Sequence, residues 1–93
     1  MDEEQRIARN REEIDRIDTQ ILVLLNRRAE CARAIGDVKR RNGLPIYVPD
    51  RERSVLARLV FENQGPLSEP AIREVFQCIF EQMKRLEGLS ESS

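Results

Sequence analysis

Residues 2–42 read DEEQRIARNREEIDRIDTQILVLLNRRAECARAIGDVKRRN, and this stretch carries the strongest structural signal of the chain. The stretch has no proline and a single glycine, Gly36, so nothing in it stops a helix before Gly43. Apolar side chains recur at two heptad positions, as on one face of an amphipathic helix. The first position carries Ile7, Ile14, Ile21, Arg28, Ile35 and Asn42, and the second carries Asn10, Ile17, Leu24, Cys31 and Val38. The pattern predicts one helix of about forty residues.

The segment after this helix predicts a break and a second helix. Gly43 suits the C-terminal cap of the long helix, and Pro49 suits the first position of the next one. Apolar residues continue through Val60, and the run Asn-Gln-Gly-Pro at 63–66 ends the helical pattern.

Capping residues also predict a third helix. Ser68 suits its N-cap and Gly88 its C-terminal cap. The sequence therefore predicts an all-α chain of one long and two shorter helices. We expect a single helical domain over residues 1–93, in which 89–93 form a flexible tail or the start of a linker.

The composition excludes several classes of function. The 16 Lys and Arg against 17 Asp and Glu leave a net charge of −1, which provides no field for nucleic acid or an anionic membrane. The absence of histidine removes His-based triads, His general bases and His-ligated zinc. No run approaches the ~20 apolar residues that span a bilayer, and no signal peptide is recognisable, so we expect a cytoplasmic protein. Cys31 and Cys78 are predicted to be buried free thiols.

The long helix exposes more apolar surface than one chain can cover. Some forty residues at 1.5 Å each run roughly 60 Å. The two shorter helices can fold back on half of that length, and the rest of the apolar stripe would face water. A second copy of the chain is the simplest cover, which predicts a symmetric homodimer whose long helices pair.

Charged residues interrupt the apolar faces of all three predicted helices. Arg28 and Lys39 point the same way on the long helix, Glu52 lies on the second helix with Arg51 at the edge of its stripe, and Glu87 lies on the third. Because unpaired buried charge is costly, these groups require partners. One interpretation is a set of internal ion pairs, Arg28 with Glu52 and Lys39 with Glu87. The other is a polar pocket inside the bundle whose cations bind a small dicarboxylate.

Arg11 extends the pocket hypothesis to a second chain. It lies about 26 Å from Arg28 along one helix, which is too far for both to hold one small molecule. If two long helices pair antiparallel and cross near Ile21 and Leu22, Arg11 of one copy comes level with residues between Arg28 and Lys39 of the other. A site shared between chains would follow. Taken alone, Arg11 reads as a solvated surface charge.

Six strings of residues stand in a specific order along the chain. They are REEIDRID at 11–18, LLNRR at 24–28, IGDVK at 35–39, PIY at 45–47, DRER at 50–53 and GPLS at 65–68. Together with the apolar helix that follows, they resemble the all-helical class of chorismate mutases. The similarity covers residues 6–88 without an obvious gap, and the order and spacing of the strings are highly specific.

The resemblance implies an intertwined, domain-swapped homodimer of three-helix chains with two equivalent sites. The implied reaction is the pericyclic Claisen rearrangement of chorismate to prephenate, in phenylalanine and tyrosine biosynthesis, with no cofactor and no metal. Carried over by position, Arg28 and the partner's Arg11 would bind the two substrate carboxylates. Lys39 would bridge a carboxylate and the ether oxygen, and Glu52 would accept a hydrogen bond from the ring hydroxyl.

The resemblance also assigns the remaining substrate-binding positions. Glu87 would face the ether oxygen, where a carboxyl group donates a hydrogen bond only when protonated. Arg51 would support a carboxylate. Val48 stands where some relatives carry an acidic residue, so only its backbone could contribute. Met83 stands where relatives carry a small hydroxyl residue.

Two other functions remain open at this point. A lyase on the same scaffold cleaves isochorismate to salicylate and pyruvate, but it typically carries Gln at the position of Glu87. A non-catalytic helical dimerisation or regulatory module is the second alternative. A further enzyme domain of the aromatic pathway, fused to the chain or associated with it, is also compatible with the sequence.

Overall fold

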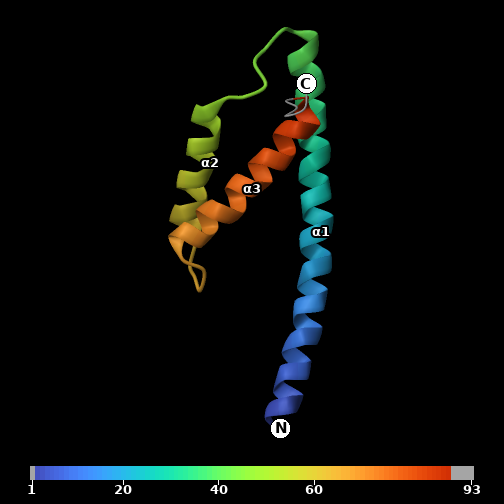
Figure 1. Ribbon diagram of the computed structural model, residues 1–93, viewed down its shortest axis with the longest axis vertical. Helices are drawn as coiled ribbons and strands as arrows, with labels where there is room; N and C mark the ends of the chain where they lie inside the picture. Colours follow the sequence, from blue (N-terminus) through green and yellow to red (C-terminus); the bar gives the residue numbers. More distant parts are fainter. Residues whose placement is uncertain (1, 89–93) are drawn as a thin grey trace. The chain divides into compact units, whose positions relative to one another are not determined.

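The computed structural model describes residues 2–88, which form three helices and no strand. Helix α1 spans Glu3–Arg41, α2 spans Pro49–Glu62 and α3 spans Glu69–Glu87 (Figure 1). The predicted all-α chain of one long and two shorter helices is therefore confirmed. The predicted tail at 89–93 lies outside the described residues. Among residues 2–88, none of the helices combines the length and the apolar composition that crossing a bilayer requires.

The ends of α2 and α3 lie where the capping and helix-breaking residues of the sequence predict them. Pro49 occupies the start of α2, after Val48, whose extended backbone serves as the N-cap without a side-chain hydrogen bond. The Ser68 hydroxyl accepts a hydrogen bond from the backbone N–H of Ala71 at 3.3 Å and so caps α3. Gly88 ends α3 with a φ of 111°, in the left-handed region that favours glycine.

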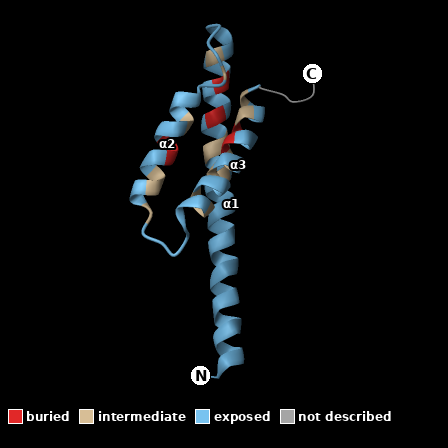
Figure 2. Cartoon of the chain, turned by 60° about the vertical axis from the view of Figure 1, so that its left-hand side comes forward, coloured by how far each residue is buried: buried red, intermediate tan, exposed pale blue. Residues whose placement is uncertain are grey.

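The chain divides into two units, Met1–Glu30 and Cys31–Ser93. The described part of the first unit is the N-terminal portion of α1, whose residues are exposed apart from the half-buried Leu25, Arg28 and Ala29 (Figure 2). Its apolar stripe is left open, with exposed fractions between 42% and 58%. The stripe consists of Ile7, Ile14, Ile17, Ile21 and Leu24.

The hydrophobic core of the second unit lies between α2 and α3. Val55 and Leu56 of α2 pack with Phe80 of α3, and Leu59 and Phe76 are partly buried against them. The ring centroids of Phe76 and Phe80 are 6.3 Å apart, with the ring planes tilted by 54°. Burying one such side chain contributes about 1.5–3 kcal/mol, so this cluster holds the two shorter helices together.

Within the second unit, α1 approaches the end of α3 at Gly36. A Cβ atom at this position would lie 2.8 Å from the Cα of Glu87 and 3.0 Å from its carbonyl oxygen. Ala32, one turn earlier on α1, is buried. The small side chain of Ala32 and the absence of a side chain at Gly36 therefore allow the backbones of α1 and α3 to come close together.

The prediction that both cysteines are buried was wrong, because Cys31 and Cys78 are exposed free thiols. Cys31 lies on the heptad stripe of α1, where Ile35 and Val38 are themselves 50% and 47% exposed. Cys78 lies two residues before the buried Phe80, about 200° around α3, so it points away from the core.

Candidate functional site

Two of the charged residues predicted from the sequence form a shielded ion pair. The Nζ of Lys39 lies 3.4 Å from Oε2 of Glu87, and the two side chains are 20% and 14% exposed. Lys39 also donates a hydrogen bond to the backbone carbonyl oxygen of Ile46 at 3.0 Å. The pairing of Lys39 with Glu87, which belongs to one of the two interpretations drawn from the sequence, is therefore confirmed. Because the pair is largely covered, salt screens it less than it screens a surface pair.

Local packing fixes Glu87 beside Lys39. The close approach at Gly36 brings the last turn of α3 against α1 one helical turn before Lys39. Arg40, the next residue of α1, donates a hydrogen bond to the backbone carbonyl oxygen of Glu87 and pairs with Asp37. That carbonyl is among the last of α3 and has no intrahelical donor, so the arginine satisfies it.

A second charged cluster centres on Lys84, a residue that the sequence reasoning missed. Its Nζ lies 2.8 Å from Oε1 of Glu81 and 3.4 Å from Oε2 of Glu52. The ammonium group also lies 4.4 Å from the centroid of the Tyr47 ring. Lys84 follows Phe80 by four residues and therefore lies on the buried face of α3. This spacing is the feature of the sequence that could have indicated a partly buried lysine.

The surrounding carboxylates keep Lys84 charged. The hydrogen bond to Glu81, with a further contribution from the charge of Glu52, outweighs partial burial and raises the pKa of Lys84 above its usual value. The same hydrogen bond lowers the pKa of the Glu81 carboxyl. Glu52 therefore faces a full positive charge at neutral pH.

The two clusters adjoin each other. Lys84 and Glu87 are three residues apart on α3, so they occupy successive turns of one face. The neighbouring residues Ile46 and Tyr47 contact Lys39 and Lys84, respectively. The result is one charged region of the second unit, formed by Lys39, Glu52, Lys84 and Glu87. Ammonium groups held in such a region can bind carboxylates.

The other predicted site residues occupy varied environments. Val48 is 39% exposed at the N-cap of α2, and Arg51 is exposed in the first turn of that helix. Met83 is a buried side chain of α3, 8% exposed. Arg11 and Arg28 belong to the first unit, where Arg11 is exposed and Arg28 is half-buried on α1.

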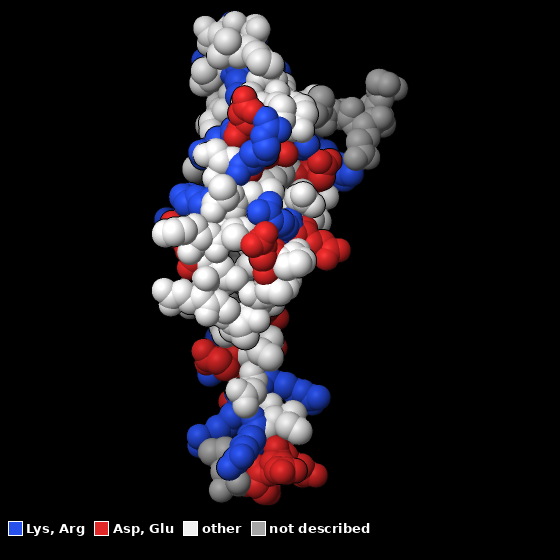
Figure 3. Space-filling view, turned by 90° about the vertical axis from the view of Figure 1, so that its left-hand side faces the viewer, with Lys and Arg blue, Asp and Glu red and all other residues white. Residues whose placement is uncertain are grey.

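Charged side chains of both signs are interspersed on the face drawn in Figure 3. This mixture agrees with the net charge of −1. A preference for anions therefore has to arise locally, from side chains such as Lys39 and Lys84, and not from the field of the whole chain.

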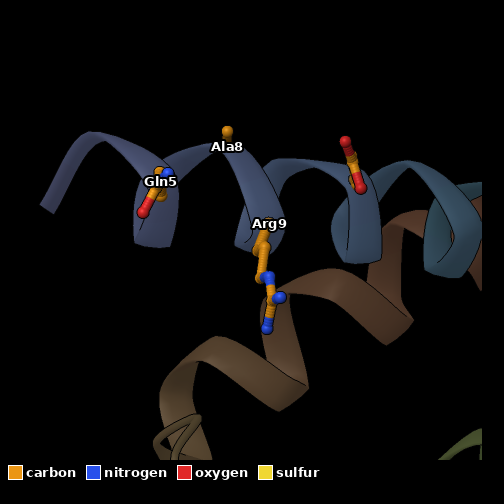
Figure 4. Close-up of a pocket in the computed structure, with 4 residues that line it drawn as sticks. Gln5, Ala8 and Arg9 are labelled. Carbon is orange, nitrogen blue, oxygen red and sulfur yellow. The ribbon is translucent and has the colours of Figure 1, made fainter. Parts of the chain in front are cut away.

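A surface depression of about 430 Å³ lies on the first unit and is lined by Gln5, Ala8, Arg9 and Glu12 (Figure 4). All four residues come from successive turns of α1. One helix cannot surround a small molecule, so this depression lacks the enclosure of a ligand site.

Known proteins match this chain over most of its length. The model of the family "Chorismate mutase type II" matches residues 10–88. The bifunctional chorismate mutase/prephenate dehydratase of Aquifex aeolicus is 40% identical over 81 residues, which are 83% of this chain and 22% of that protein. The chain thus spans about a fifth of the length of this relative.

Solved structures match the fold as well as the sequence. Chorismate mutase (form II) from Thermus thermophilus superimposes with a TM-score of 0.88 at 40% identity, covering 91% of this chain and 97% of that one. Chorismate mutase from Helicobacter pylori in complex with prephenate gives a TM-score of 0.82 at 28% identity, covering 89% and 90%. Because the family model matches residues 10–88 and the solved relative is 40% identical with a TM-score of 0.88, the protein belongs to the chorismate mutase type II family.

Proposed function

We propose that the chain catalyses the rearrangement of chorismate to prephenate, the branch step toward phenylalanine and tyrosine. The observation that carries this proposal is the shielded pair of Lys39 and Glu87 within a chain that matches the family over residues 10–88. These are the two positions that the resemblance assigns to the ether oxygen of the substrate. The solved relative from Helicobacter pylori holds prephenate, the product of the proposed reaction.

The chemistry of the step suits a chain without histidine. One carbon–oxygen bond breaks and one carbon–carbon bond forms within a single molecule, and no proton, nucleophile or metal takes part. The protein has to hold the compact, chair-like conformer and to stabilise the negative charge that develops on the ether oxygen. In this proposal the ammonium group of Lys39, anchored on the carbonyl of Ile46, supplies that stabilisation.

The remaining roles follow the family's pattern. Arg28 and the partner's Arg11 bind the two substrate carboxylates, and planar guanidinium groups suit that task because they bind carboxylates bidentately. Glu52 accepts a hydrogen bond from the ring hydroxyl, and Arg51 supports a carboxylate.

Two uncharged residues complete the proposed site. Val48 contributes through its backbone, which is extended at the N-cap of α2. Met83 forms an apolar wall on α3, in keeping with its burial.

Glu87 faces the reacting atoms in this mechanism. Its Oε2 pairs with Lys39, and the resemblance assigns its carboxyl group to the ether oxygen of the substrate. Glu87→Gln places an amide at this position, which can donate a hydrogen bond to the ether oxygen, so the variant should retain turnover. Loss of turnover in Glu87→Gln would contradict this role.

The proposed functional unit is an intertwined, domain-swapped homodimer with two shared sites. Its support is the apolar stripe of α1, which stays open to solvent in the single chain. Pairing of two such stripes would bury them and bring Arg11 of each copy to the site of the other. We also propose the cytoplasm as the compartment, as predicted from the sequence.

The decisive test is an assay of the purified chain with chorismate. Loss of chorismate absorbance, with prephenate identified as the product, supports the proposal, and absence of turnover overturns it. Arg28→Met should lower kcat/KM by two orders of magnitude or more. Arg27→Met, at an exposed neighbouring position, is the matched control and should keep wild-type turnover.

The same Arg28 variant separates a catalyst from a helical scaffold. Arg28 is half-buried rather than part of the core, so we expect its packing to be largely replaced by the methionine side chain. We therefore expect Arg28→Met to stay folded, with a two-state urea transition, while its turnover is lost. A loss of folding in step with the loss of turnover would instead assign Arg28 a structural role.

A further inference from the structure

Lys84 is outside the set of residues that the resemblance assigns to the substrate, yet it contacts one of them. Its Nζ lies 3.4 Å from Oε2 of Glu52, and the side chains of Lys84 and Glu52 are 16% and 26% exposed. Lys84 belongs to the last turn of α3, whereas Glu52 belongs to the first turn of α2. The contact therefore links two helices at the charged region.

Glu52 needs support from outside its own helix. A carboxylate that accepts a hydrogen bond from a substrate hydroxyl has to be held in one rotamer by its neighbours. The proposed substrate brings two further negative charges close to it. An ammonium group in contact with the carboxylate fixes its orientation and offsets the repulsion between its charge and the substrate carboxylates.

The aromatic ring of Tyr47 adds a second link. It lies 4.4 Å from Nζ of Lys84, a distance at which a ring face attracts a cation. Tyr47 belongs to the connection that leads into α2. One ammonium group thus contacts both this connection and the first turn of α2.

A local helical pair does not account for these contacts. Glu81 lies three residues before Lys84 on the same helix, and its side chain is 55% exposed. The Lys84 side chain is instead only 16% exposed and lies against α2 and Tyr47. A surface ion pair contributes little to stability, so the pair with Glu81 alone does not explain this partial burial.

We infer that Lys84 is a positioning residue of the active site, which holds the Glu52 carboxylate and the connection at Tyr47 in the orientation that receives the substrate hydroxyl. The inference rests on the proposed function. Lys84 acts through Glu52 and does not itself bind the substrate.

The test compares three variants of the full chain for kcat, KM and urea unfolding. Lys84→Met, which keeps the length of the stem and removes the charge, should lower kcat/KM by roughly ten- to a hundredfold, the range expected for a small displacement of a reacting group. Lys84→Arg restores a cation and should recover activity to within about threefold of wild type. Glu81→Gln removes only the local pair and should leave kcat/KM within about twofold of wild type.

A double-mutant cycle with Glu52→Gln separates positioning from direct substrate binding. If Lys84 acts through Glu52, adding Lys84→Met to Glu52→Gln should lower kcat/KM by less than about twofold more, because the group being positioned is already neutral. A full additional loss in the double variant would overturn the inference and make Lys84 a substrate ligand. Equal kcat/KM values for Lys84→Met and wild type would overturn it as well.

Urea unfolding of wild type, Lys84→Met, Glu52→Gln and the double variant tests the contact between Lys84 and Glu52 without relying on catalytic activity. A coupling between Lys84 and Glu52 in the unfolding midpoints reports their contact whether or not the chain turns over chorismate. An inactive wild type would overturn the proposed function and this inference with it, even if that coupling is present. An active wild type without the coupling would overturn the inference alone.

Discussion

Residues 2–30 and residues 31–88 differ in what their apolar side chains contact. In the first part, isoleucines at heptad positions of α1 remain between 42% and 53% exposed. In the second part, Val55, Leu56 and Phe80 are at most 7% exposed and form a core with their neighbours. The second part therefore closes on itself, whereas the first part has an apolar face that nothing in its own unit covers.

The open apolar face of residues 2–30 supports the proposal that part of the stabilising contacts comes from a second chain. A surface of repeated isoleucines at seam positions is what a coiled-coil partner covers. The core of the second part is small, and the described residues include no side chain that is fully buried and large. We therefore expect the stability of the whole protein to depend on association as well as on its own core.

The largest effect should come from placing a charge on the open face of α1. Ile21→Glu puts a carboxylate on the proposed dimer seam, where an unpaired charge costs several kcal/mol. We expect a monomer by sedimentation and a loss of turnover of at least about a hundredfold, because the partner's Arg11 is then missing. Thr19→Glu, on the opposite side of the helix, is the matched control and should stay dimeric. Retention of the dimer by Ile21→Glu would break the contrast between the two parts.

The next largest effect should come from shortening a core side chain of residues 31–88, measured as the free energy of unfolding. Phe80→Ala removes a ring that is 6% exposed and should lower the free energy of unfolding by about 3–5 kcal/mol. Phe61→Ala removes a ring that is 91% exposed and should change it by no more than ~0.5 kcal/mol. Urea unfolding of the two alanine variants measures the difference. Similar losses for both would mean that Phe61 is covered in the assembled protein.

A smaller effect is expected where α1 approaches α3. Gly36→Ala places a Cβ 2.8 Å from the Cα of Glu87, so backbone has to move. We expect a loss of about 1–3 kcal/mol in the free energy of unfolding, with lower turnover because Glu87 is displaced from Lys39. Arg33→Ala, at an exposed position of the same helix, is the control for the added alanine. Wild-type turnover in Gly36→Ala would show that the position of Glu87 tolerates such a shift.

The smallest effect is a pH dependence of stability that comes from Lys84. Because its pKa is raised above the ordinary value of 10.5, its contribution is fully present below pH 10.5 and is lost as pH rises through the folded-state pKa. Glu81, whose pKa is lowered from 4.5, gives a matching loss as pH falls below that value. The difference in urea midpoint between wild type and Lys84→Met should therefore be constant near neutral pH and shrink above pH 10.5. A difference in urea midpoint that increases at alkaline pH would contradict the pairing of Lys84 with Glu81 and Glu52.

Much of the fold could be predicted because local signals agree with it. Pro49 and Gly88 mark helix ends through their backbone preferences, and Ser68 marks one through its side-chain hydroxyl. The ion pair of Lys39 with Glu87 was also predictable, since each charge interrupts an apolar face and requires a partner. The helix-end signals depend on only a few neighbouring residues, whereas the ion pair was predictable from the general cost of unpaired buried charge.

What could not be predicted depends on which distant residues surround a side chain that the sequence already explains locally. The sequence shows Lys84 three residues after Glu81, which is typical of a surface pair, and nothing local indicates Glu52 or Tyr47 as its neighbours. The cysteines were misjudged for a related reason. Cys31 lies on an apolar stripe, but a stripe predicts burial only when something covers it, and the single chain leaves this one open.

The hydrogen bond from Lys39 to the carbonyl of Ile46 bears on the entropy of substrate binding. Fixing a free lysine side chain costs about 1.5–2 kcal/mol of rotamer freedom. Here the side chain is already held at its tip, so that loss occurs when the chain folds and is not repeated when a ligand arrives. An ammonium group immobilised in advance binds an anion with little further ordering of its own.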